Sequence, residues 1–199
     1  MFYDAIENNH GLPRDPFKSL VVPRPIGWVS SLAPDGIVNL APYSFFNAIG
    51  DRPHYVMFSS DGVKDSQRNI EATGSFVCSL ATWELKDKMN MTSAGVASNV
   101  DEFELAGLTP VAGELVAPPR VGESPVALEC LFHQTLSLPG ADASRDHYNM
   151  VIGKVVGIHI DDSVIVDGRI DVTKLRPIAR LGYMDYCVVD EVFTMQRPT

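Results

Sequence analysis

Short runs of β-forming residues, separated by Gly and Pro, recur along most of this chain and limit the folds open to it. Such runs occupy residues 25–33, 37–40, 54–59, 75–80, 126–136 and 149–160, with a shorter one at 169–172. Helical patterns cover only residues 16–20, 64–73 and 83–91, the last continuing with breaks toward residue 105. Many strands with few helices predict a mainly β fold, a β-barrel with peripheral helices.

Two glycines mark where these elements turn or end. Pro34 and Asp35 precede Gly36, which is free to take a positive φ and form a turn between two strands. Gly74 can cap the helix of residues 64–73 in the left-handed conformation. Within that helix we expect Ile70 and Ala72 to face inward.

Length, charge and cysteine content restrict the class of protein. A chain of 199 residues suits one domain, residues 1–199, with residues 1–22 as an N-terminal extension. No run has the apolar length of a membrane helix and no signal peptide is recognisable, so we expect no membrane association. The net charge of −9 disfavours nucleic acid as a partner. Cys78, Cys130 and Cys187 lie apart among apolar neighbours, which predicts buried thiols and a cytoplasmic location.

The histidines and the standard nucleotide-binding motifs give little information about function. None of the five histidines has the spacing of metal ligands, so no metal site is predicted. His147 precedes a long strand and is a candidate for reaching the edge of a ligand. No P-loop, GxSxG or GxGxxG motif is present, so a nicotinamide would have to bind without a nucleotide domain of its own.

The start of the helix at residues 64–73 has the chemistry of an anion site. Free N–H groups and the positive end of the helix dipole favour a phosphate there, and Lys64 and Ser66 add a charge and a hydroxyl. Ser59 and Ser60 end the preceding strand only a few residues away. The alternative is an ordinary polar cap, with Asp65 or Ser66 capping and Lys64 in solvent.

Two further segments suggest contacts with a flat anionic ligand. In residues 39–46, small Ala41 and rigid Pro42 precede aromatic residues, and such a stretch can meet the faces and polar edge of a flavin ring. An ordinary core strand is the alternative. Arg24 stands between two prolines, which hold the backbone extended and orient its side chain for a phosphate or carboxylate. The same sequence is equally compatible with a solvated arginine on the surface. Trp28 is expected in the core.

Three segments, matching in order, make the chain similar to the flavin reductase-like family over about residues 18–185. They are residues 23–30 (Pro-Arg-Pro-Ile-Gly-Trp-Val-Ser), 39–46 (Asn-Leu-Ala-Pro-Tyr-Ser-Phe-Phe) and 64–70, which begin with Lys-Asp-Ser. Residues 147–155 and the Arg-Leu-Gly-Tyr of residues 180–183 add weaker matches. Where the family often has threonine this chain has Ser66, which keeps the hydroxyl.

The resemblance implies an FMN-binding split β-barrel, and it assigns roles to named residues. The FMN phosphate would be held by Ser59, Lys64, Asp65 and Ser66, with Ser60 beside them. The flavin would be lined by Arg24, Ile26, Ser30, Asn39, Ala41, Ser44, Phe45 and Phe46. Members of the family are typically homodimers with FMN at the subunit interface.

The activity that the resemblance implies is an FMN-dependent oxidoreductase, in which NAD(P)H reduces the flavin and an acceptor or a partner such as a monooxygenase receives the electrons. The cofactor would do the chemistry, so no catalytic triad is required. One alternative is an FMN-binding electron relay without nicotinamide activity. Another is a dimeric structural module that binds no flavin.

Overall fold

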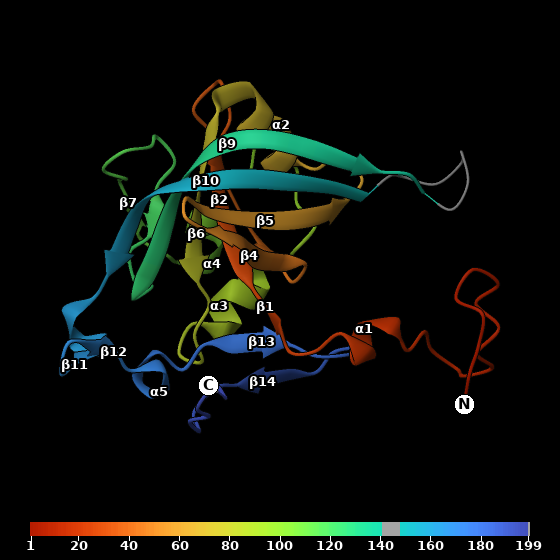
Figure 1. Ribbon diagram of the computed structural model, residues 1–199. Coiled ribbons are helices and arrows are strands. Elements are labelled where there is room, and N and C mark those ends of the chain that lie inside the picture. The colour runs from red at the N-terminus through yellow and green to blue at the C-terminus, as the bar shows by residue number, and fades with distance from the viewer. Residues whose placement is uncertain (141–147, 199) are drawn as a thin grey trace.

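The computed structural model describes residues 1–140 and 148–198 (Figure 1). Its body is a seven-stranded antiparallel sheet with the strand order β3-β2-β6-β9-β10-β5-β4. The strands are β2 (Gly27–Leu32), β3 (Val38–Tyr43), β4 (Phe46–Asp51), β5 (His54–Asp61), β6 (Ser75–Leu80), β9 (Val126–Leu138) and β10 (Tyr148–Ile160). The mainly β fold with peripheral helices is therefore confirmed.

The order of the strands explains why the sheet curls into a barrel. β3 and β4 are the two edge strands, yet only Ser44 and Phe45 separate them in the sequence. Two residues span too short a distance to cross a flat seven-stranded sheet, so the edges must approach one another. The Ser59 N–H donates to the Phe45 carbonyl at 2.8 Å and ties this link to β5.

Smaller elements surround the barrel. One three-stranded sheet joins β1 (Arg24–Pro25), β13 (Ile178–Arg180) and β14 (Tyr186–Val188), and two hairpins pair β7 (Pro110–Val111) with β8 (Arg120–Val121) and β11 (Ile165–Val166) with β12 (Arg169–Ile170). The helices are α1 (Phe17–Leu20), α2 (Asp65–Thr73), α3 (Lys86–Met91), α4 (Glu102–Ala106), α5 (Val172–Leu175) and the 3-10 helix η1 (Asp162–Val164). In Figure 1, α2 lies at the top of the molecule, and α3 and α4 lie in the middle, between the large sheet and the strands β13 and β14.

Two apolar clusters form the core. One gathers Trp28, Leu40, Met89 and Phe103 between β2, β3 and the helices α3 and α4. The other gathers residues of the barrel strands and α2, among them Phe58, Ile70 and Phe76. Trp28 is fully buried, as expected, and its Nε1 donates to the Thr92 hydroxyl at 2.9 Å, which satisfies its polar atom. Gly36 and Gly74 have positive φ, also as expected.

Several sequence expectations differ from the structure. The strand expected at residues 25–33 is broken after Pro25, which pairs with β13 while β2 pairs with β3 and β6. The helix expected at residues 83–91 begins only at Lys86, and α4 is a separate helix. β4 was not expected from the sequence; its residues Phe46–Asp51 include a glycine and are largely exposed. Ala72 is exposed rather than inward-facing, and Cys187 is only partly buried, unlike Cys78 and Cys130.

None of the helices in the described part of the chain is both long and apolar enough to span a membrane.

Candidate functional site

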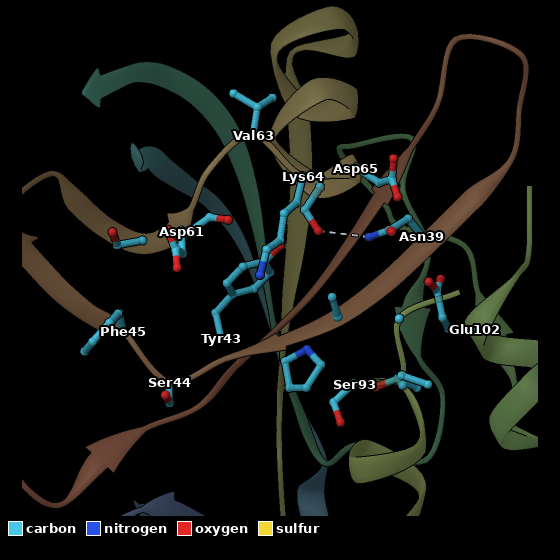
Figure 2. A pocket seen from close by; sticks show the side chains of 18 of the residues that line it. Asn39, Tyr43, Ser44, Phe45, Asp61, Val63, Lys64, Asp65, Ser93 and Glu102 are labelled. Carbon is cyan, nitrogen blue, oxygen red and sulfur yellow. Dashed lines mark hydrogen bonds between the residues drawn. The ribbon is translucent and has the colours of Figure 1, made fainter. Parts of the chain in front are cut away.

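A cavity of about 620 Å³ opens where β3 ends, between the link from β5 to α2 and the loop that follows α3. Figure 2 shows Phe45 and Asp61 on one side and Ser93 and Glu102 on the other. Nine of the residues expected to bind FMN line this cavity: Asn39, Ala41, Ser44, Phe45, Ser59, Ser60, Lys64, Asp65 and Ser66. Residues from three separate stretches of the sequence thus meet at one hollow.

The first turn of α2 is open to an anion. Lys64 occupies the N-cap position in an extended conformation, and its side chain makes no capping hydrogen bond to the first turn of the helix. The unpaired N–H groups and the helix dipole therefore favour negative charge at this end. The Lys64 side chain extends from here into the cavity (Figure 2). The alternative considered from the sequence, an ordinary polar helix cap by Asp65 or Ser66, does not form.

Asp65 places a carboxylate beside this anion site, but the charge is compensated. Its Oδ1 forms an ion pair with the guanidinium of Arg68, one turn later in α2. Arg68 also donates to the Val63 carbonyl at 3.1 Å, which fixes it against the start of the helix. Arg52, the third cation of this stretch of sequence, lies instead on the exposed turn after β4, beside Asp51.

The serines near α2 offer free hydroxyl hydrogens. Ser60 is 2% exposed, and its Oγ makes no hydrogen bond of good geometry within the described chain, although the Tyr43 phenol lies beside it. A buried hydroxyl without a partner costs free energy, so it indicates a ligand or water at this point. Ser66 is buried as well, and its Oγ accepts from Asn39 Nδ2 at 2.9 Å (Figure 2). Ser66 can still donate its own hydrogen.

Aromatic rings form the other end of the cavity. Phe45 is half-buried, and its ring centroid lies 6.2 Å from that of Tyr148, edge to face. Tyr43 stacks at 4.5 Å on Phe58 of the core and is nearly buried. Burial raises the pKa of Tyr43, and the neighbouring hydroxyls of Ser66 and Ser60 counteract this only in part. Tyr43 therefore stays a neutral phenol and hydrogen-bond donor near the phosphate end.

The wall opposite Phe45 consists of the loop after α3 and one carboxylate. Residues 92–96 line the cavity with small side chains, and Glu102 lines it from α4. Glu102 Oε2 accepts the Leu40 N–H at 2.9 Å. Burial raises the pKa of Glu102, with the charges of Asp101 and Asp65 adding to the effect. This carboxylate holds β3 in place beside the cavity.

Four expected flavin ligands do not line the cavity, and their flavin contacts stay predictions. Ile26 lies in the core, Ser30 Oγ donates to the Pro119 carbonyl, and the ring of Phe46 packs over Gly27. Arg24 is 6% exposed and donates to the carbonyls of Lys18, Val21 and Leu181. It is neither solvated nor aimed into the cavity, because these three backbone carbonyls accept its hydrogen bonds. His147 lies outside the described residues.

The sequence reasoning missed several lining residues, namely Lys18, Asp61, Val63, Thr92, Ser93, Ala94, Gly95, Val96 and Glu102. The run Ser93-Ala94-Gly95 carried a usable signal, because small residues allow a ligand to approach the backbone closely. Glu102 and Lys18 carried no such signal in the sequence. They reach the cavity only through tertiary packing.

These residues fit FMN on the chemistry of their donors. A phosphate requires hydrogen-bond donors and positive charge, which the α2 N-terminus, Lys64 and the Ser60 hydroxyl supply together. An isoalloxazine ring requires flat apolar contact and backbone polar groups, which residues 41–45 and Tyr148 provide. The volume of the cavity lies within the usual range for sites that hold small molecules and cofactors.

Comparison with known proteins agrees with this geometry. The family model described as flavin reductase like domain matches residues 19–174. An uncharacterised protein of Aquifex aeolicus is 37% identical over 171 residues, which cover 82% of this chain and 83% of that protein. The crystal structure of nitrilotriacetate monooxygenase component B from Bacillus cereus has a TM-score of 0.88 at 30% identity, covering 98% of each chain.

The fold itself has a further solved counterpart. A protein with a split barrel domain from Shewanella frigidimarina superposes with a TM-score of 0.86 at 22% identity, over 100% of both chains. The expected split barrel is therefore confirmed. With more than half of its residues matched by the family model, this chain belongs to the flavin reductase-like family.

Proposed function

We propose that this protein binds FMN in the cavity at α2 and is an FMN-dependent oxidoreductase. The observation that carries the proposal is the combination at one point of an uncapped helix start, a free lysine and the unpartnered buried Ser60 hydroxyl. A phosphate satisfies all three. Bound FMN would supply two-electron redox chemistry, and the protein would bind, orient and shield it.

NAD(P)H is the proposed electron donor, and an acceptor molecule or partner protein the proposed recipient. The family matched by the chain supports reductase chemistry. The similar Bacillus cereus protein is named as a component of a monooxygenase, which supports transfer to a monooxygenase partner. The roles proposed for Ser59, Ser60, Lys64, Asp65 and Ser66 are contacts to the phosphate, and those for Ala41, Ser44 and Phe45 are contacts to the ring.

We further propose a homodimer acting in the cytoplasm. Leu20, Val21 and Val22 expose apolar side chains in one stretch near the cavity, a pattern typical of interfaces. The free thiols of Cys78 and Cys130 suit a reducing compartment. Analytical ultracentrifugation is expected to give twice the mass of the chain, and a monomer at all concentrations would contradict the dimer.

The test of the activity is a visible spectrum of the purified protein after FMN is supplied, followed by anaerobic addition of NADH or NADPH. We expect a bound-flavin spectrum that bleaches with one of the two nicotinamides. A flavin spectrum that stays oxidised would favour the electron relay without nicotinamide activity. Failure to take up FMN would contradict the site itself.

A further inference from the structure

A second cavity, of about 510 Å³, adjoins the candidate flavin site. Its lining consists of Asp15, Phe17, Lys18, Phe45, Ser59, Leu138 and Tyr148. Lys18, Phe45, Ser59 and Tyr148 also line the first cavity, so the two hollows share a wall. A molecule in the second cavity would therefore lie directly beside one in the first.

Two of the three residues that line only the second cavity, Asp15 and Phe17, come from the start of the chain, and the third is Leu138. Asp15, Phe17 and Lys18 precede residue 19, where the match to the family model begins. They are held in place by the buried Arg24, whose guanidinium donates to the carbonyl of Lys18 in α1, to that of Val21 just after α1 and to that of Leu181. Arg24 is thus a positioning residue, which fixes α1 against the body of the protein.

The lining of this cavity combines flat rings with one free cation. Phe17, Phe45 and Tyr148 supply the rings and Leu138 adds an aliphatic side. The Lys18 ammonium lies 5.9 Å from the centroid of Phe45 and forms no ion pair with any described residue. The Arg24 guanidinium lies at the same distance from that ring. Among the described lining residues Asp15 is the one opposing charge, and its Oδ1 accepts the Phe17 N–H at 2.8 Å.

We propose that the second cavity binds a planar aromatic carboxylate, with the ring among Phe17, Phe45 and Tyr148 and the carboxylate at Lys18. Aromatic side chains favour edge-to-face and offset contacts with a flat ring, and the free ammonium favours an anionic substituent on it. The place beside the flavin site makes this molecule a second substrate. That role rests on the proposed FMN-dependent activity, whereas the binding itself does not.

The experiment titrates 2-naphthoate into the FMN-loaded protein, where FMN occupies the first cavity, and follows calorimetric heat and the visible flavin spectrum. We expect saturable binding that perturbs the flavin band. Lys18→Gln is expected to weaken 2-naphthoate about threefold to fivefold, the range for a solvent-accessible ion pair. The same variant should leave the neutral 2-naphthamide unchanged. Phe17→Ala should weaken both ligands by about fivefold.

The matched control is Lys154→Gln, which removes an exposed lysine of β10 that lines neither cavity. Absence of saturable binding, or equal affinity in wild type and Lys18→Gln, would overturn the proposal. An equal loss in Lys154→Gln would overturn it as well, because it would mean a general charge effect. FMN uptake is titrated separately. Lys18-dependent 2-naphthoate binding by a protein that takes up no FMN would overturn the proposed function and keep this site.

Discussion

Lys64 is the residue on which the affinity for a phosphate should depend most. It is exposed at the N-cap of α2, extends into the cavity, and forms no ion pair with any described residue. We expect Lys64→Gln to raise the Kd for FMN about tenfold, equal to about 1.4 kcal/mol. Fluorescence titration measures this, with Lys154→Gln as the control. Riboflavin, which lacks the phosphate, should bind both proteins alike, and an equal loss for riboflavin would contradict the assignment.

At Ser60 a single substitution should affect the stability of the FMN-free protein and its affinity for FMN in opposite directions. Its buried hydroxyl has no partner among the described residues, so Ser60→Ala removes a desolvation cost from the FMN-free protein. The free energy of unfolding of that form should stay equal or rise by up to about 1 kcal/mol, while FMN affinity falls about fivefold. Denaturant unfolding of the variant measures the change in stability, and FMN titration of the same variant measures the change in affinity. A clear loss of stability without FMN would mean that the hydroxyl has a structural partner.

At the scale of elements, a buried carboxylate fastens a loop to the barrel. Glu129 of β9 is fully buried and accepts N–H bonds from Glu114 at 2.8 Å, Leu115 at 2.6 Å and Val116 at 3.1 Å. It also pairs with His159 of β10. Burial alone would raise the pKa of Glu129, but the His159 contact and the backbone N–H bonds together lower it below its ordinary value.

The lowered pKa gives a pH dependence of defined sign. Because the folded state holds Glu129 ionised more firmly than the unfolded state does, its contribution is present above the ordinary glutamate pKa and is lost as the pH falls through the lowered one. We expect Glu129→Gln to cost about 2–4 kcal/mol at neutral pH and to flatten the acid limb of the stability curve below about pH 4.5. Urea unfolding across that range measures both effects. An unchanged acid limb would contradict the role.

At the scale of the whole molecule, FMN should stabilise the fold because its proposed site joins β3, β5, α2 and the loop after α3. At about 100 times its Kd, a ligand that binds only the native state adds about 2.7 kcal/mol. For a chain of this size we expect the Tm to rise by about 5–10 °C. Thermal scans with FMN, riboflavin and inorganic phosphate should rank in that order. Equal shifts with riboflavin and FMN would contradict a phosphate site at α2.

Local sequence patterns were enough to predict the β-rich architecture, the helix at α2 and the residues of the anion site. These depend on short-range physics: alternating apolar residues, a glycine at φ +81° after Thr73, and hydroxyls and a lysine within a few positions of a helix start. The resemblance to the family extended this to FMN. Nine of the thirteen expected ligands then met in one cavity.

Only the tertiary structure decided which side chains turn toward that cavity. Arg24 is a cation between prolines in the sequence, but in the fold it is buried and donates to the carbonyls of Lys18 in α1, Val21 just after α1 and Leu181 just after β13. Ser30 and Phe46 are likewise satisfied or packed inside the barrel. Lys18, Glu102 and Glu129 acquire their partners across long sequence separations. Such contacts depend on how the sheet curls, which no local pattern encodes.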